Sequence, residues 1–223
     1  LDNVSLEGDV VCFSYALTAL LVLEKRVWME YGRNTTYVQY TLRGSFDSDD
    51  DTSFLTLTLF PFCLSRDYHS TTRGAEDWHF IVDNQQGHCQ VRADASSPLY
   101  HLIMGPNVTY NRTGYWYWHV HHRRDGERGL PEEEDVYQPG KFSLQMTPGM
   151  RASIVLSAET ALPTDFGSSA HEDAVQQALT RHQRRIRQLL IVADRSTNTL
   201  QVDDPVQARL VVAADQFIVA RPD

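Results

Sequence analysis

Positive charge is scarce in this sequence. Lysine and arginine together number 20, against 29 aspartates and glutamates, which gives a formal net charge of −9 over 223 residues. A protein that binds nucleic acid replaces counterions with clustered lysine and arginine, and the only strongly basic run is residues 181–187. That run lies in a predicted helix with an apolar opposite face, so we interpret it as a solvated face or a domain contact. The composition therefore argues against a nucleic-acid partner.

Long apolar runs and cysteines are also few. The longest apolar stretch, residues 16–23, is interrupted by Thr18 and followed by charged residues. A transmembrane helix needs about 20 apolar residues, so no membrane span is expected. The three cysteines, Cys12, Cys63 and Cys89, are widely spaced and form no metal or redox motif. We expect buried, reduced thiols in a cytoplasmic protein.

Strand periodicity extends from about Val10 to Ser157. Apolar residues alternate along residues 38–42, 55–59 and 152–157. Period two places one set of side chains on a core face and the other set on the opposite face. No helical pattern separates these strands, so neighbouring strands are expected to be antiparallel. The sequence predicts a mainly β fold, an antiparallel β-sandwich, over residues 1–157.

Helical periodicity replaces the strand pattern near residue 158. Apolar residues recur at helical spacing over residues 174–193, and Ser168 and Ser169 are candidate caps. We therefore expect a helical linker over residues 158–202. A further helix is expected over residues 203–223, because Asp204 and Pro205 form a typical helix start.

This last helix carries an apolar stripe that needs a partner surface. The stripe consists of Val206, Leu210, Ala213, Ala214, Phe217 and Ile218. We expect the chain to be a piece of a longer polypeptide whose next domain covers the stripe. In the absence of that domain, the exposed helix predicts a dimer.

An aromatic run and a histidine cluster are the first candidate sites. In residues 115–118, Trp116 and Trp118 are candidate sugar platforms, because exposed rings stack on the C–H faces of sugars. Alternate rings of the run are expected to point into the core. His119 and His121 would share one face of a strand, so a metal-dependent β-sandwich protein stays an alternative. A third ligand at fixed spacing is not evident, and no metal ligand is assigned.

Two charged segments supply the other candidates. Arg66, Asp67 and His69 follow an apolar strand and should lie at a sheet rim, where loops build functional surfaces. Arg66 and Asp67 could equally form a structural ion pair. Glu127 and Arg128 precede the acidic residues 132–135. Paired carboxylates serve glycoside hydrolysis, but carboxylates crowded in one loop also pair with arginine or face solvent.

Several further segments are informative as an ordered set that spans nearly the whole chain: Glu24-Lys25-Arg26-Val27-Trp28-Met29, Gly32-Arg33-Asn34-Thr35-Thr36-Tyr37-Val38-Gln39-Tyr40, Pro61, Arg66-Asp67-Tyr68-His69, Glu127-Arg128-Gly129-Leu130, Glu134-Asp135, Pro139-Gly140 and Phe142. In this order they resemble one known family, the N-terminal domain of bacterial and archaeal glycogen debranching enzymes of the amylo-α-1,6-glucosidase type. Residues 213–219 resemble the entry to that family's catalytic domain.

The resemblance implies a galactose-mutarotase-like β-supersandwich, joined by helices to an (α/α)6 barrel that carries the catalytic carboxylates. The parent enzyme would hydrolyse α-1,6 branch linkages without a cofactor, and this chain alone would be non-catalytic. We expect Trp116, Trp118, Glu127 and Arg128 at the rim nearest the barrel, where α-glucan could bind, with Arg66, Asp67 and His69 as further candidates. The alternative is a purely structural scaffold from a related glucoamylase or disaccharide phosphorylase.

Overall fold

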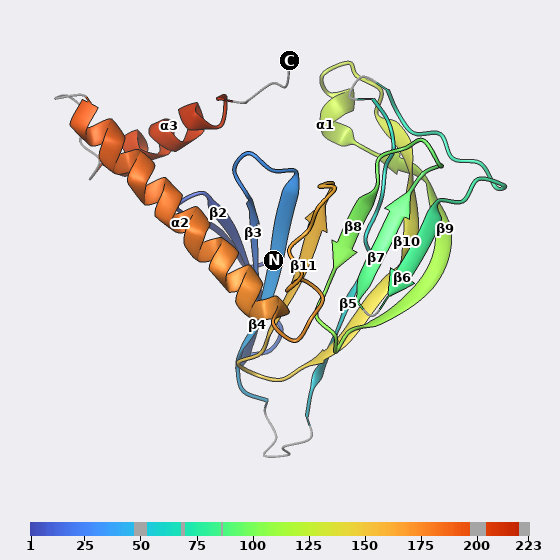
Figure 1. Cartoon of the computed structure of the whole chain (residues 1–223), viewed down its shortest axis with the longest axis horizontal. Coiled ribbons are helices and arrows are strands. Elements are labelled where there is room, and N and C mark those ends of the chain that lie inside the picture. The colour runs from blue at the N-terminus through green and yellow to red at the C-terminus, as the bar shows by residue number, and fades with distance from the viewer. Residues whose placement is uncertain (47–52, 68–69, 86, 197–203, 219–223) are drawn as a thin grey trace.

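A computed structural model describes residues 1–46, 53–67, 70–85, 87–196 and 204–218, and it is mainly β, with helices toward the C-terminal end (Figure 1). The strands are β1 (Asn3–Glu7), β2 (Val10–Ala16), β3 (Leu21–Met29), β4 (Thr35–Gly44), β5 (Leu55–Leu59), β6 (Ile81–Gln85), β7 (His88–Arg92), β8 (Tyr100–Ile103), β9 (Thr109–His121), β10 (Glu133–Met146) and β11 (Arg151–Ser157). The helices are α1 (Arg123–Gly126), α2 (His171–Ser196) and α3 (Pro205–Asp215).

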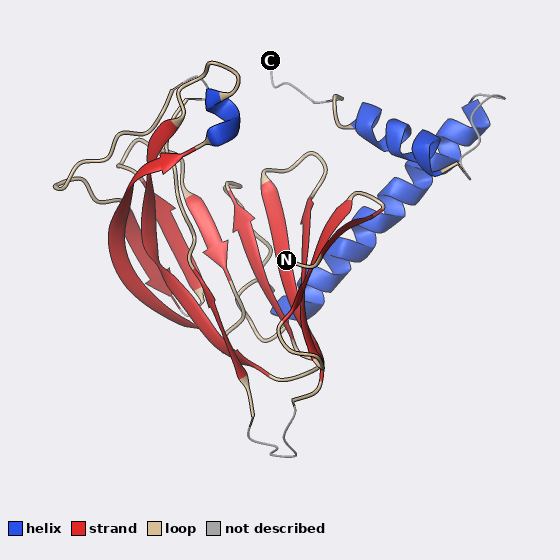
Figure 2. Ribbon diagram, turned by 180° about the vertical axis from the view of Figure 1, so that it is seen from behind, coloured by secondary structure: helices blue, strands red, loops and turns tan. Residues whose placement is uncertain are grey.

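The strands form two sheets that face each other (Figure 2). The large sheet has the order β1-β2-β3-β4-β11-β8-β7-β6, and the small sheet has the order β5-β10-β9. Every strand pair in both sheets is antiparallel. The predicted antiparallel sandwich is thus confirmed.

The main core lies between the inner faces of the two sheets. β10 contributes Tyr137 and Phe142, both fully buried, and these pack against Val38 of β4 and Ile154 of β11. Val38 and Ile154 are paired directly across the two central strands, so period two places both on the inner face. Burial of such apolar side chains is the main stabilising contribution to the sandwich.

The outer face of the large sheet is covered in part by α2. Val175, Ala178 and Leu179, spaced at three and four residues, pack against Tyr37 and Val155. The first residue of α2, His171, also anchors the helix to the large sheet. The backbone N–H of Gly167 donates to Nδ1 of His171 at 3.1 Å, so Nε2 carries the proton and donates to the carbonyl of Ser153 in β11 at 3.0 Å. The predicted cap Ser168 lies in the turn just before α2, where its Oγ accepts from the N–H of Ala170 at 3.1 Å and its carbonyl accepts from the N–H of His171 at 3.0 Å.

The last helix, α3, begins as the sequence predicts. Asp204 is the N-cap, accepting from the N–H of Val206 at 2.9 Å, and Pro205 is the first helical residue. The side that faces α2 contains Val212 and Asp215, which are the buried residues of α3. The predicted stripe points elsewhere: Val206, Leu210, Phe217 and Ile218 are 63–86% exposed.

Two local features differ from the sequence analysis. The short helix α1 interrupts the predicted all-strand region between β9 and β10, because the chain turns there through i+3 and i+4 backbone hydrogen bonds. A further strand, β1, precedes the predicted start at Val10 and pairs with β2 at the edge of the large sheet.

Candidate functional site

Most of the candidate residues gather at one rim of the small sheet, beside α1 (Figure 1). The segment that follows β5 runs along β10 and extends the small sheet there. Cys63 forms a bridge with Tyr137, and the N–H of Asp135 donates to the carbonyl of Thr72 at 3.0 Å. This segment carries Arg66 to the end of β10, where the acidic residues lie.

Arg66 forms a bidentate ion pair with Glu134. Nε lies 2.8 Å from Oε2 and Nη2 lies 3.3 Å from Oε1. Glu134 is only 3% exposed and also accepts from the N–H of Thr72 at 3.3 Å. Nε2 of His122 lies 3.1 Å from Oε1 of Glu134, but its direction does not make a hydrogen bond, so this contact is electrostatic and depends on protonation of His122. The buried carboxylate is therefore held by several groups.

Asp135, the neighbour of Glu134, is held by backbone groups. Its two oxygens accept from the N–H of His119 and the N–H of Gly74, each at 2.9 Å. Burial acts to raise the pKa of Asp135, but these two hydrogen bonds outweigh it and the pKa lies below its ordinary value. His119 has φ +55°, a left-handed conformation that is uncommon outside glycine, next to a register irregularity in β10. Asp135 thus fixes a strained turn of the rim.

The aromatic run divides between the two faces of β9. Trp116 is half-buried, packs against Phe80 and Tyr137, and donates its Nε1–H to the carbonyl of Trp78 at 2.7 Å. Trp118 stacks on Trp116 with ring centroids 5.8 Å apart and remains 45% exposed. Two of the four rings therefore point inward, as expected, and Trp118 is the inward one that reaches solvent at the rim.

The other two rings, Tyr115 and Tyr117, lie on the outer face of the small sheet and are 62% and 43% exposed. Phe62 packs edge-on against Tyr117 with centroids 4.9 Å apart. On the inner face, the backbone of Gly74 passes directly over the rings of Trp116 and Trp118, and a Cβ at Gly74 would lie only 2.7–2.8 Å from them. The close approach of this backbone holds both indoles in place.

Glu127 and Arg128 lie at the exposed C-terminal end of α1. Glu127 pairs with Arg124 at 2.6 Å and with Arg123 at 3.5 Å. Arg128 is exposed, and its N–H donates to the carbonyl of Asp125 at 3.0 Å. These side chains therefore belong to the outer surface of the rim and are not part of the buried network around Glu134.

The remaining candidates are Asp67, His69 and the two strand histidines. Asp67 is exposed and its carbonyl accepts from Nη1 of Arg66 at 3.3 Å, whereas His69 lies outside the described residues. His119 lies 3.4 Å from Glu133, and His121 lies 3.3 Å from Glu132. Across the part of the chain that the structure describes, no group of three histidine, cysteine, aspartate or glutamate side chains could hold a metal ion.

The sequence analysis grouped Glu134 and Asp135 with the acidic residues 132–135 and did not predict that these two side chains are buried. β10 begins with three acidic residues, Glu133, Glu134 and Asp135, and this is a signal, because an inward-facing position of a strand needs a partner when its side chain is charged. The sequence left open whether Arg66 forms an ion pair with Asp67, and in the structure the guanidinium of Arg66 pairs with Glu134. Among the described helices, none is long and apolar enough to cross a membrane.

Comparison with known proteins agrees with this architecture. The model of the family described as glycogen debranching enzyme N terminal matches residues 1–153, which covers β1 to β10 and the start of β11. A search of curated proteins found no match. The family match covers more than half of the chain and confirms the resemblance predicted from the sequence. The chain belongs to the glycogen debranching enzyme N-terminal family.

Proposed function

We propose that this chain is the non-catalytic β-sandwich of a glycogen debranching enzyme, that it supports the catalytic domain, and that it contacts α-glucan at the rim around Trp118. The parent enzyme would hydrolyse α-1,6-glucosidic branch linkages. The three cysteines are buried free thiols, which supports a reducing, cytoplasmic setting. The observation that carries the proposal is the family match, together with the half-exposed ring of Trp118, which stacks on Trp116.

The state of the rim carboxylates supports a non-catalytic role. Glycoside hydrolysis needs one carboxyl group that is protonated near neutral pH and a second carboxylate across the scissile bond. Asp135 has a lowered pKa and accepts two backbone hydrogen bonds, so it favours the ionised form. Glu134 is enclosed by Arg66 and the N–H of Thr72. Asp135 is therefore unsuited to act as the general acid, and the carboxylate of Glu134 is occupied by its structural partners.

A hydrolysis assay tests this part of the proposal. The chain alone, incubated with branched α-glucan, should release no glucose. Release of glucose that is abolished in both Glu134→Gln and Asp135→Asn would overturn the non-catalytic assignment.

Glucan contact is assigned to Trp118. Its indole is 45% exposed, and Trp116 supports it from the core side. A rigid aromatic ring beside charged hydrogen-bonding groups suits a sugar, because the ring packs on C–H faces while polar groups meet the hydroxyls. Calorimetric titration with a malto-oligosaccharide should show saturable binding that Trp118→Ala abolishes. Absence of binding at millimolar sugar would favour the purely structural scaffold.

The partner of α3 is proposed to be the (α/α)6 catalytic domain. Val206 and Leu210 of α3, with Phe217 and Ile218 just after its end, form an apolar, exposed surface, whereas Val212 and Asp215 are buried. An exposed apolar stripe of this kind marks an interaction surface. The chain alone should therefore form a concentration-dependent dimer that Leu210→Glu weakens. The parent enzyme, in which the catalytic domain covers the stripe, should not form that dimer, and its persistence there would contradict the assignment.

A further inference from the structure

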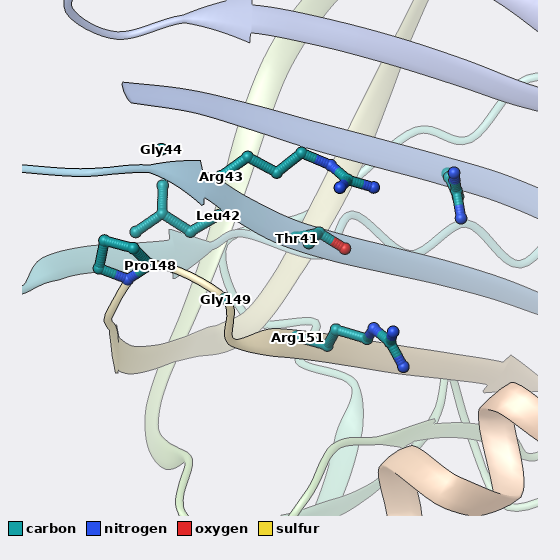
Figure 3. A pocket seen from close by; sticks show the side chains of 8 residues that line it. Thr41, Leu42, Arg43, Gly44, Pro148, Gly149 and Arg151 are labelled. Carbon is teal, nitrogen blue, oxygen red and sulfur yellow. The ribbon is translucent and has the colours of Figure 1, made fainter. Parts of the chain in front are cut away.

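Three guanidinium groups line one pocket on the outer face of the large sheet. Arg26 comes from β3, Arg43 from β4 and Arg151 from β11, and the pocket has a volume of about 430 Å³. Thr41 of β4 pairs with Arg151 of β11 and precedes Arg43 by two residues. Period two therefore places Thr41, Arg43 and Arg151 on the same face of the sheet. Figure 3 shows the side chains of Arg43 and Arg151 extending in the same direction, with Thr41 between them. We call this the arginine pocket.

The charge of the arginine pocket is only partly balanced. Nε of Arg43 lies 2.6 Å from Glu24, and Nη2 of Arg26 lies 3.2 Å from Glu7. Arg151 instead donates to the neutral amide oxygen of Gln176 at 3.4 Å, and no ion pair to it is found in the described part of the chain. None of the residues that line the pocket is acidic. Three positive groups therefore meet two carboxylates in a protein whose net charge is −9.

Many donors in the pocket are left for a ligand. A guanidinium has five N–H groups, and each carboxylate partner engages one edge of it. The Arg43 side chain is 54% exposed and that of Arg26 is 25% exposed, so both stay accessible beside their partners. The Thr41 hydroxyl adds a neutral donor and acceptor at the centre of the pocket.

The walls of the arginine pocket are fixed by backbone geometry. The N–H of Gly149 donates to the carbonyl of Leu42 at 2.8 Å, and the N–H of Leu42 donates to the carbonyl of Met150 at 3.1 Å. Leu42 itself is fully buried in the core. Gly44 has φ +100°, and a Cβ at that position would collide with the carbonyl of Leu20. The backbone that carries Arg43 and Arg151 is therefore held in place before a ligand binds, which limits the ordering cost to the side chains.

We propose that the arginine pocket binds a phosphate group, either free or as the monoester of a small sugar. Planar guanidinium forks match phosphate oxygens in bidentate pairs. Arg151 contacts a neutral amide, whereas Arg43 and Arg26 each share their guanidinium with one carboxylate. The volume of about 430 Å³ lies in the range of small-molecule sites and exceeds what a single phosphate group fills. A long polyanion is disfavoured, because the protein as a whole is acidic and repels it.

Titration of the chain with inorganic phosphate, with glucose 1-phosphate and with glucose, at constant ionic strength, tests this proposal. Both phosphate probes should bind saturably and glucose should not. Tighter binding of glucose 1-phosphate identifies a sugar monoester as the ligand, whereas equal affinity identifies the phosphate group alone. The absence of saturable phosphate binding in the millimolar range would overturn the proposal.

The variants separate the site from general electrostatics. Arg151→Gln removes the arginine without a carboxylate partner, so the protein should keep its melting temperature and lose affinity by roughly tenfold or more. Arg43→Lys keeps a positive charge for Glu24 but loses the fork, and should also weaken binding. Arg112→Gln, an exposed arginine of β9 in the small sheet, is the matched control and should bind normally. Equal losses in Arg151→Gln and Arg112→Gln would contradict a built site.

Discussion

The guanidinium of Arg185 on α2 forms a bidentate ion pair with the carboxylate of Asp215 on α3, with Nη1–Oδ2 and Nη2–Oδ1 distances of 2.8 and 2.9 Å. The same guanidinium lies 3.4 Å above the ring of Tyr31, in the turn between β3 and β4. The hydroxyl of Tyr31 in turn donates to the carbonyl of Ile218 at 3.1 Å. One arginine therefore ties the end of the helical region to a turn of the large sheet.

Loss of this pair should release α3 without unfolding the sandwich. In Asp215→Asn we expect faster amide hydrogen exchange in α3, because the bidentate ion pair becomes a single hydrogen bond from the guanidinium to a neutral amide oxygen. The free energy of local opening should fall by about 1–2 kcal/mol. Exchange in β4 and β11 should not change. Arg209→Gln, on the exposed part of α3, is the control. Unaltered protection of α3 in Asp215→Asn would show that apolar contacts alone hold the helix.

The buried pair of Arg66 and Glu134 should be costly to break from one side. Arg66→Met leaves the 3% exposed carboxylate of Glu134 without its main partner and should lower the free energy of unfolding by about 2–3 kcal/mol. The double variant Arg66→Met/Glu134→Gln should recover part of that loss, because no buried charge is left unpaired. Urea unfolding of both variants and of Glu134→Gln completes the cycle. A double variant less stable than Arg66→Met would refute this explanation.

Acid should destabilise the protein through its buried histidines. Burial lowers the pKa of His171 and, together with the neighbouring His101, lowers the pKa of His88. Such a histidine takes up its proton in the unfolded chain before it does so in the folded one. Stability is therefore complete above the ordinary pKa of 6.5 and is lost as the pH falls below it.

Thermal melting at about pH 7.5 and about pH 5.5 measures this effect, and the melting temperature should be lower at the acidic pH. The difference between the two conditions should shrink in His171→Gln, even though that variant loses hydrogen bonds to Gly167 and Ser153 and is less stable at both values. An identical pH difference in the wild type and in His171→Gln would rule out His171 as a contributor.

Two glycines with positive φ should respond differently to alanine. Gly32 has φ +71° with no atom within 4 Å of an added Cβ, so Gly32→Ala should cost only the strain of the left-handed conformation, about 1 kcal/mol. At Gly44 the added Cβ also collides with the backbone of Leu20. Gly44→Ala should therefore cost about 3 kcal/mol or more. Equal losses, measured by urea unfolding, would mean that the turn at Gly44 adjusts freely.

The sequence was informative where structure depends on neighbouring residues. Alternation along residues 38–42 and 152–157 predicted the strands β4 and β11, and Asp204 with Pro205 predicted the start of α3. These features follow from local backbone geometry and capping, which a short window of sequence contains. The four-residue helix α1 was missed because so short an element has no helical periodicity.

The rim could not be assembled from the sequence because its contacts join residues far apart in the chain. Arg66 meets Glu134 across 68 positions. The register of β10 against β9 shifts between Glu134 and Val136 and again between Gln138 and Gly140, so alternation alone does not give the facing side chains. The exposure of Trp118 likewise depends on how Gly74 crosses its ring.

The most direct test of the central claim is calorimetric titration of the wild type, Trp118→Ala and Tyr115→Ala with the same malto-oligosaccharide. The two substitutions remove exposed rings from opposite faces of β9, so they form a matched pair. A glucan site at the rim predicts saturable binding that is lost in Trp118→Ala and retained in Tyr115→Ala. Retention of full affinity in Trp118→Ala, or no binding by the folded wild type, would contradict it.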